Sequence, residues 1–401
     1  MSPDAGRPWC KPCVDKGGVA PRWTSTAGCY NPARMKAVLN GREAQLFHGL
    51  DRPALLAVYR CMLLSRKLDD KEIQLKNQSH IYFQISGAGH EAVLVAAGLT
   101  LKPGYDWFFP YYRDRALCLQ IGMTPLDMLL AAVGAKDDPN SGGRQMPSHW
   151  GRTDLNIVSG SSPTGTQLLH AVGAAEAGVI YSRVSQIADR ASRFHADEIT
   201  YVSLGDGATS EGDAHEALNF AAVWQAPVVF VVQNNGYAIS VPLAKQSAAP
   251  SLAHKGIGYG VPSRLIDGND PAMVFCAVRD AVEAARRGEG PALIEALTYR
   301  IEAHTNADDA ARYRSQDEVA YWLARDPVDR LERHITARGL LDAAGRQAIA
   351  DEAEAFAESL RERMNEDPKL DPASLFDHVY ATPTRALRAQ AAALAEELAE
   401  A

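Results

Sequence analysis

Strand patterns alternate with helix patterns through the middle of the chain. The segments "ITYVSLG" (199–205), "VVFVVQ" (228–233) and "PALIEALTY" (291–299) are short and almost continuously apolar, as buried strands are. Helix patterns at 211–224 and 271–287 separate them. Strands joined through helices in this order pair in parallel, with right-handed crossovers. The sequence therefore predicts an α/β fold with a parallel sheet that helices cover on both faces.

Two further parts flank this predicted domain. Residues 1–45 are rich in Pro, Gly and basic side chains and follow no regular period, so we expect an irregular N-terminal arm. The domain itself is predicted to span residues 46–335, and residues 336–401 are predicted to form a helical C-terminal region. Between 136 and 166 the chain is rich in Gly, Ser and Pro. A loop of that length is usually functional or disordered, and His149 within it favours function.

The composition argues against several classes of protein. The chain has 401 residues and a net charge of -8, which does not suit a nucleic-acid or anionic-membrane surface. It contains neither an apolar run of roughly 20 residues nor an apolar signal-peptide core, so we expect a cytoplasmic protein. Six cysteines in this length do not predict a disulfide scaffold. Cys10 and Cys13 form "CKPC" without a second pair, and we interpret this motif as incidental.

Polar residues follow two of the predicted strands. Asp206 lies between Gly205 and Gly207 at the end of one strand, and Asn234 and Asn235 follow the next. The carboxyl ends of parallel strands meet at one edge of a sheet, where ligands bind. The following helix directs free N–H groups at this turn, which suits a phosphate. Because a bare carboxylate would repel a phosphate, we expect a divalent cation such as Mg2+ between them.

The turn allows two other interpretations. "GDGATS" nearly matches a nicotinamide-binding loop, but Ser210 replaces the third glycine and no acidic residue closes the following strand. A tight turn followed by an asparagine-rich turn, without any ligand, is the purely structural alternative. A cation–diphosphate site accounts for Asp206 and Asn235 together, whereas the nicotinamide interpretation accounts for neither.

These residues carry a resemblance to a known family. Gly-Asp-Gly, followed about thirty residues later by Asn-Asn, resembles the thiamine diphosphate fingerprint. "GDGATSEGDAHEALNFAAVW" and "QNNGYAIS" resemble the alpha subunit of the decarboxylating component of 2-oxoacid dehydrogenase complexes. "GGRQMPSHWG" and "YRIEAHTNADDAARYR" are similar to its branched-chain (2-oxoisovalerate) members. The resemblance covers roughly residues 50–330 and implies the thiamine diphosphate-binding fold.

The resemblance implies roles for residues at matching positions. Asp206, Asn235 and the backbone carbonyl of Tyr237 would bind Mg2+. The implied contacts to the cofactor come from Tyr112, Arg113, Ser162, Thr164, Asp206, Gly207, Ala208, Glu211, Asn235, Arg300 and His304. A guanidinium such as that of Arg113 suits phosphate oxygens. The family often has leucine in place of Thr164 and, in some members, arginine in place of Gln233.

Other implied roles concern the reaction. His304 matches a histidine that faces the reacting carbon of the cofactor, and imidazole chemistry suits proton transfer near neutral pH. The substrate residues implied are Phe83, Tyr112 and His149. Ser161, Thr166 and Gln167 match a monovalent-cation (K+) site of some members.

The resemblance also implies partners. The family's cofactor lies between alpha and beta subunits of an α2β2 heterotetramer, and the acyl group passes to a lipoyl arm on an acyltransferase core. We therefore expect the isolated chain to be inactive. Two alternatives stay open: a pyruvate or acetoin dehydrogenase alpha subunit with the same site, or a non-catalytic scaffold subunit that retains the fold. The preferred 2-oxoacid, the beta subunit's identity and the role of the N-terminal arm stay undecided from the sequence.

Overall fold

A computed structural model describes residues 50–81, 83–184, 193–364 and 371–400. The predicted N-terminal arm, with Cys10 and Cys13, lies outside the described residues. Within the described part, no helix is both long and apolar enough to cross a membrane.

The core of the molecule is a five-stranded parallel sheet with the order β1-β2-β3-β7-β6. Its strands are β1 (Trp107–Phe109), β2 (Thr200–Gly205), β3 (Val228–Asn234), β7 (Ala292–Leu297) and β6 (Ser263–Asp267). The three strands predicted from apolar runs are β2, β3 and β7, and they lie side by side at the centre. β1 has only three residues and β6 is only partly buried, so neither forms an apolar run long enough to recognise. The predicted parallel α/β fold is confirmed.

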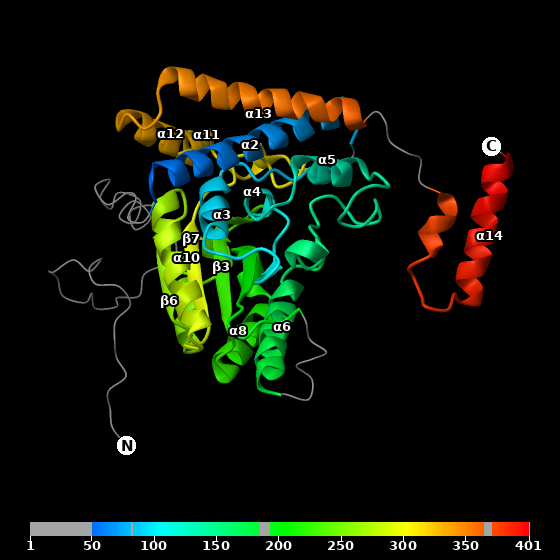
Figure 1. Ribbon diagram of the computed structural model, residues 1–401, viewed down its shortest axis with the longest axis horizontal. Coiled ribbons are helices and arrows are strands. Elements are labelled where there is room, and N and C mark those ends of the chain that lie inside the picture. The colour runs from blue at the N-terminus through cyan, green and yellow to red at the C-terminus, as the bar shows by residue number, and fades with distance from the viewer. Residues whose placement is uncertain (1–49, 82, 185–192, 365–370, 401) are drawn as a thin grey trace.

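Alternate residues of the central strands face two separate cores. Val229 and Val231 of β3 pack with helices on one face of the sheet, whereas Val228, Phe230 and Val232 pack on the other. The first face carries α2 (Arg52–Asn77), α3 (Glu91–Gly98), α4 (Arg115–Gln120) and α10 (Pro271–Arg286), and Figure 1 shows α3 and α10 beside β3 and β7. The second face carries α6 (Thr166–Arg183), α8 (Gly212–Trp224) and α9 (Ala253–Gly258).

A local sequence signal sets the start of one helix. Thr124 accepts a hydrogen bond from the N–H of Asp127 at the start of α5 (Pro125–Val133), and the Asp127 side chain bonds back to Thr124. This capping box satisfies two N–H groups that the helix leaves free. His90, in contrast, precedes α3 without making a capping bond through its side chain.

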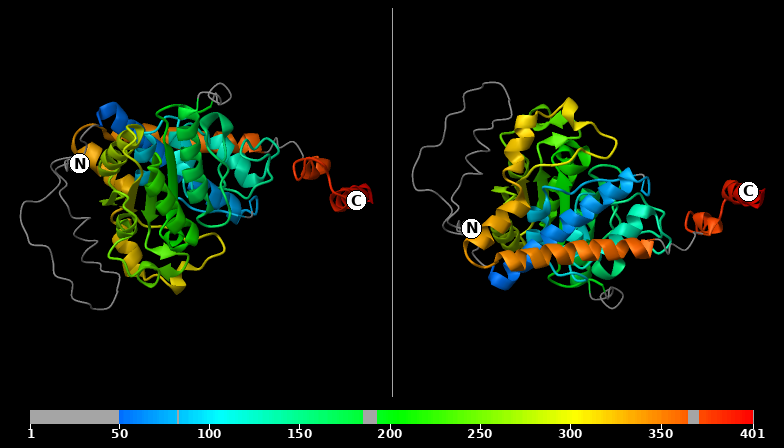
Figure 2. Two further views of the ribbon diagram at one scale, coloured as in Figure 1. Left: turned by 90° about the horizontal axis from the view of Figure 1, so that it is seen from below. Right: turned by 90° about the horizontal axis from the view of Figure 1, so that it is seen from above.

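The C-terminal region is helical, as predicted. Within residues 336–401 lie α13 (Ala343–Met364) and α14 (Arg385–Glu400), whereas α11 (Gln316–Leu323) and most of α12 (Pro327–Ala337) precede residue 336. Figures 1 and 2 show α13 running alongside α2, where the pairs Lys67–Glu354 and Lys71–Glu358 join the two helices. α14 packs against the short helix η6 (Pro372–Phe376), away from the α/β unit. The boundary at residue 335 stays a prediction.

Candidate functional site

A pocket opens at the carboxyl edge of the sheet, beyond the ends of β2 and β3. Its empty space measures about 1020 Å3, including its open mouth. The sequence-predicted site residues on its wall are Tyr112, Arg113, His149, Ser161, Ser162, Thr164, Gln167, Asp206, Gly207, Ala208, Glu211, Asn235, Tyr237, Arg300 and His304. Phe83 and Thr166 do not line it. Residues from six separate stretches of the chain therefore meet at the edge where parallel sheets bind ligands.

Asp206 lies at the floor of this pocket with 1% of its surface exposed. Burial raises the pKa of its carboxyl to about 6, against hydrogen bonds from Gln246 and from the backbone of Asn235. The Gln246 amide donates to Oδ2 over 2.8 Å. The carboxylate has no cationic side chain within 4.0 Å among the described residues, so a bound cation would relieve the cost of burying it.

The neighbouring turn supplies a second oxygen. Asn235 is 3% exposed, and its Oδ1 accepts the backbone N–H of Tyr237 over 3.2 Å. Tyr237 begins the hairpin of β4 (Tyr237–Ala238) and β5 (Val241–Pro242). A Cβ at Gly207 would lie 2.7 Å from the Cβ of Ala238, so only glycine lets the Asp206 turn pack against this hairpin.

The donor set fits a hard cation. A carboxylate, an amide oxygen and a backbone carbonyl are ligands that Mg2+ accepts. No group of three or more His, Cys, Asp or Glu side chains that could hold a metal occurs in the described ranges. The predicted set contains only one such side chain, so its remaining ligands have to come from the amide, the carbonyl and a bound phosphate.

Two buried arginines face the same pocket. Arg113 and Arg300 are each 1% exposed, and neither has a carboxylate within 4.0 Å in the part of the chain that the structure describes. Arg113 donates to the carbonyl of Ser86 over 2.7 Å, and Arg300 donates to the carbonyl of Ile239 over 2.9 Å. Burial and then the charge of Arg113 lower the pKa of Arg300. Two buried guanidinium groups without a counter-ion call for an anion, and phosphate oxygens are suited to them.

His304 lies between the two arginines. Its Nδ1 is 2.9 Å from Arg113 Nη2 and 3.3 Å from Arg300 Nη1. Since arginine only donates, Nδ1 is the acceptor and the proton is on Nε2. Burial, then Arg113 and then Arg300 lower the pKa of His304 to about 4. The ring is therefore neutral near pH 7, with an Nε2–H as its remaining donor.

The opposite wall comes from the long Gly/Ser/Pro-rich loop. His149 Nε2 and Ser162 Oγ are 2.9 Å apart, which links the middle of this loop to its C-terminal part. Gln167, in the first turn of α6, donates to the carbonyl of Ser203 on β2 over 3.2 Å. Ser161, Thr164 and Glu211 add further oxygen atoms to the lining. The predicted functional role of this loop stays a prediction, but the loop does form a wall of the pocket.

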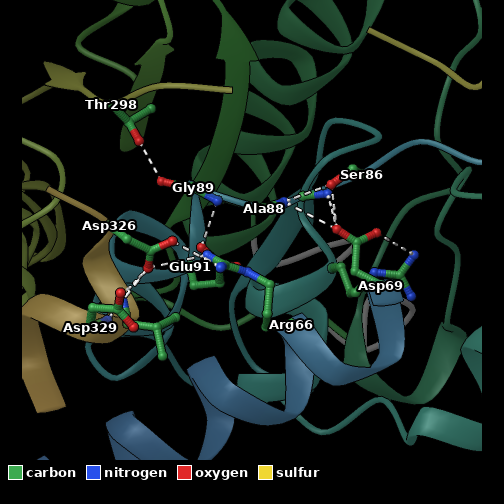
Figure 3. A network of polar contacts seen from close by, with 12 residues as sticks. Arg66, Asp69, Ser86, Ala88, Gly89, Glu91, Thr298, Asp326 and Asp329 are labelled. Carbon is green, nitrogen blue, oxygen red and sulfur yellow. Dashed lines mark hydrogen bonds and ion pairs between the residues drawn. The ribbon is translucent and has the colours of Figure 1, made fainter. Parts of the chain in front are cut away.

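A buried polar network adjoins the segments that contact the pocket arginines, and Figure 3 shows it around Asp69 and Glu91. Asp69 on α2 accepts the hydroxyl of Ser86 and the N–H groups of Gly87 and Ala88, the latter two over 3.1 and 3.2 Å. This fixes the carbonyl of Ser86 that receives Arg113. No sequence pattern marks residues 86–88, because they belong to neither a helix nor a strand.

The same network reaches the segment that carries Arg300. Glu91 accepts the N–H of Gly89 over 2.8 Å and the guanidinium of Arg66 over 2.6 Å, and Arg66 continues to Asp326 (Figure 3). The hydroxyl of Thr298 donates to the carbonyl of Gly89 over 2.6 Å. A Cβ at Gly89 would lie 2.0 Å from the carbonyl oxygen of Tyr299, so the two segments touch only because residue 89 is glycine.

Two pocket neighbours escaped the sequence analysis. Gln246 holds Asp206, yet it lies in "LAKQS" without a recognisable motif. Ile239 lines the pocket with φ of 54°, a left-handed conformation that is strained for a β-branched residue. Its carbonyl receives Arg300. Pocket proximity and a positive φ are properties of the folded backbone, and no sequence signal could have shown them.

Comparison with known proteins identifies the family. The family model described as "Dehydrogenase E1 component" matches residues 59–373. This chain belongs to the dehydrogenase E1 component family. The matched range includes the sheet, the pocket and the C-terminal helices α11 to α13. The resemblance inferred from the sequence is confirmed.

Relatives within the dehydrogenase E1 component family carry specific names. The chain is 40% identical over 333 residues to the 2-oxoisovalerate dehydrogenase subunit alpha of Bacillus subtilis, covering 83% of this chain and 97% of that protein. It is 40% identical over 357 residues to the 3-methyl-2-oxobutanoate dehydrogenase subunit alpha of Mycobacterium tuberculosis, covering 89% and 91%. The human mitochondrial 2-oxoisovalerate dehydrogenase subunit alpha is 34% identical over 363 residues, covering 89% and 78%.

Proposed function

We propose that this chain is the alpha subunit of a branched-chain 2-oxoacid dehydrogenase that uses thiamine diphosphate and Mg2+. The observation that carries the proposal is the pair of buried guanidinium groups, Arg113 and Arg300, without a carboxylate partner in the described residues, in the same pocket as Asp206. The names of relatives 40% identical over most of both chains support the branched-chain substrate.

Each predicted residue has a place in this proposal. Asp206, Asn235 and the Tyr237 carbonyl would hold Mg2+. Arg113, Arg300 and Tyr112 would hold the diphosphate together with the backbone of Gly207 and Ala208. Ser162, Thr164 and Glu211 would lie along the rest of the cofactor, and Ser161, Thr166 and Gln167 remain the residues for a K+ ion. Thiamine diphosphate, when bound, supplies the nucleophilic and electron-accepting chemistry of decarboxylation.

The chain itself supplies charge, position and a proton. The two guanidinium groups neutralise phosphate charge while the acidic side chain of Asp206 holds the cation. His304 stays neutral because burial and then the two arginines depress its pKa to about 4, so its Nε2–H can donate a hydrogen bond to a substrate oxygen. Tyr112 packs edge-on against this ring, with centroids 6.1 Å apart, which helps to fix its orientation. Phe83, Tyr112 and His149 remain the proposed substrate residues.

The relatives are alpha subunits by name, and we infer that this chain assembles with a beta subunit. The further steps, an α2β2 heterotetramer, transfer of the acyl group to a lipoyl arm and a cytoplasmic location, are part of the same proposal. The open mouth of the pocket leaves room for a second subunit to complete the site.

Calorimetry on the full chain co-purified with its beta subunit tests the proposal. We expect thiamine diphosphate to bind only when Mg2+ is present, and D206N to abolish that binding. The reconstituted complex should decarboxylate 3-methyl-2-oxobutanoate in preference to pyruvate. A preference for pyruvate or acetoin would move the assignment to those enzymes. No Mg2+-dependent cofactor binding by the wild-type complex would leave the scaffold interpretation.

A further inference from the structure

A buried carboxylate on the central strand β7 contacts the residue that precedes Asn235, one of the proposed cation ligands. Glu295 is 1% exposed and points to the sheet face that carries α9, as its neighbour Leu293 does. Its register partners are Val232 on β3 and Leu265 on β6, so it lies in the middle of the sheet. Among the described residues no lysine or arginine comes within 4.0 Å of it. A buried carboxylate is costly, so its hydrogen bonds deserve an explanation.

One carboxylate oxygen holds the turn that carries Asn235. Oε1 accepts the side-chain amide of Asn234 over 2.7 Å. The other end of that amide, Oδ1, accepts the N–H of Gly236 over 3.1 Å, and the backbone carbonyl of Asn234 accepts the N–H of Thr298 over 2.9 Å. Asn234 thus makes three hydrogen bonds, through its amide nitrogen, its amide oxygen and its backbone carbonyl. They hold the turn that carries Asn235, and the first of them is made to Glu295.

The other oxygen begins a path to Asp206. Oε2 accepts the N–H of Ala253, the first residue of α9, over 2.7 Å. The residue before this helix, Leu252, has no side chain that could cap it, so Glu295 takes over that role from a neighbouring strand. α9 in turn presents Lys255.

Lys255 completes the path. Its Nζ donates to the carbonyl of Thr209 over 2.6 Å and to the Thr209 hydroxyl over 3.0 Å. The Thr209 hydroxyl donates to the backbone carbonyl of Asp206 over 2.7 Å. The second carboxylate oxygen of Glu295 is therefore connected, through α9, to the turn of the other proposed cation ligand.

We propose that Glu295 is a positioning residue that sets the separation of Asp206 and Asn235 and thereby the affinity for Mg2+. This inference rests on the proposed function. The Asn234 amide and the Ala253 N–H are both donors, and the ionised carboxylate offers each of them an acceptor oxygen. Outer partners of metal ligands typically change metal affinity by 10–100-fold when they are replaced.

Glutamine at this position separates positioning from folding. E295Q keeps the volume of the side chain but offers one acceptor, and its NH2 group faces the donor of the other partner. We expect the dissociation constant for Mg2+, measured by calorimetry at saturating thiamine diphosphate on the full chain with its beta subunit, to rise on the order of ten-fold. Mn2+ binding followed by electron paramagnetic resonance should weaken in parallel, and this readout does not depend on activity.

Two further variants make the outcome decisive. K255M breaks only the path to Asp206 and should weaken Mg2+ binding by a few-fold. D106N is the matched control, because Asp106 is also fully buried but holds Arg286 and the N–H of Ile199 at the opposite edge of the sheet. D106N should lower the thermal midpoint and leave Mg2+ affinity within about two-fold of the wild type.

The possible results separate this inference from the proposed function. Absence of Mg2+-dependent cofactor binding in the wild-type complex overturns the proposed function itself. Wild-type binding combined with unchanged Mg2+ affinity in E295Q overturns only the positioning role, as does an equal loss in D106N. If E295Q does not fold, unchanged affinity in K255M overturns it instead.

Discussion

Arg113 and Arg115 are two residues apart and equally buried, yet their surroundings are opposite. Arg115 donates to both carboxylate oxygens of Glu72, and its Nη1 is 2.8 Å from Glu72 Oε1. Its Nη2 lies 4.0 Å from Asp69 Oδ1. Among the described residues, Arg113 donates only to the carbonyl of Ser86 and to backbone and ring atoms of His304. The protein supplies a counter-ion where the charge serves the fold. At Arg113, where on our proposal a diphosphate binds, the described part of the chain supplies no carboxylate.

Replacing each of these two arginines in turn should produce the two largest effects, a loss of stability for Arg115 and a loss of cofactor affinity for Arg113. R115M leaves the carboxylate of Glu72 buried and unpaired, and we expect a loss of about 3–5 kcal/mol in the free energy of unfolding. R113Q removes a charge that has no carboxylate partner in the described residues, so it should cost at most about 1 kcal/mol in stability. Instead it should weaken thiamine diphosphate binding by roughly 100-fold, since it removes a charge-assisted phosphate contact.

Denaturant unfolding of the cofactor-free complex and calorimetric titration measure the two quantities separately. A loss of stability in R113Q as large as in R115M, with unchanged cofactor affinity, would show that Arg113 serves the fold. The comparison between the two arginines would then fail.

Asp206 is the corresponding carboxylate, because no cationic side chain of the described residues lies within 4.0 Å of it. It therefore allows a test of metal removal. Its raised pKa of about 6, caused by burial, exceeds the usual unfolded value of about 3.9. Folding therefore favours the protonated carboxyl. The stability that this protonation gives is fully present below the unfolded pKa of about 3.9 and is lost as the pH rises through 6. At pH 7 D206N should stabilise the metal-free complex by up to about 3 kcal/mol. Added Mg2+ and thiamine diphosphate should raise the thermal midpoint of the wild type but not of D206N.

His304 gives a smaller effect with the opposite pH dependence. Its pKa of about 4 lies below the ordinary 6.5 because of burial and the two arginines. Between these values the unfolded chain binds more protons than the folded one, so stability falls as pH falls from 6.5 to 4. Replacing the imidazole by an amide in H304Q should remove roughly 1–2 kcal/mol of that decline. Parallel unfolding curves at pH 5 and pH 7.5 measure it, and an identical decline in both proteins would contradict the assigned pKa.

The sequence predicted the central sheet and the cation-binding edge because both are local patterns. Continuous apolar runs mark β2, β3 and β7, and polar residues directly after two of them must meet at one edge. The positions of Arg113 and His304 were inferred only through the resemblance. What escaped depends on long-range packing: Gln246 reaches Asp206 across 40 residues, and Glu295 reads as one polar residue inside an apolar strand. Charge pairing cannot be predicted from the sequence either, since no residue close to Arg113 or Arg115 in the chain shows which of the two has a carboxylate partner.

The smallest effect should come from Ile239, where strain rather than charge distinguishes the pocket from the rest of the fold. Of the five described residues other than glycine with positive φ, it is the one that is β-branched, and its side chain is 54% exposed. I239G adopts this φ without strain, so the strain relieved, of order 1 kcal/mol, offsets the greater freedom that glycine has in the unfolded chain. We expect the stability of the cofactor-free complex to change by less than about 1 kcal/mol. Cofactor affinity should fall measurably, because the carbonyl that holds Arg300 then belongs to a more mobile turn.

A matched I257G change, at a residue that is also exposed but lies in α9, should instead cost helix stability through glycine's low helix propensity. If both variants lost the same stability and neither changed cofactor affinity, the strained turn would have no connection to the arginine that it holds.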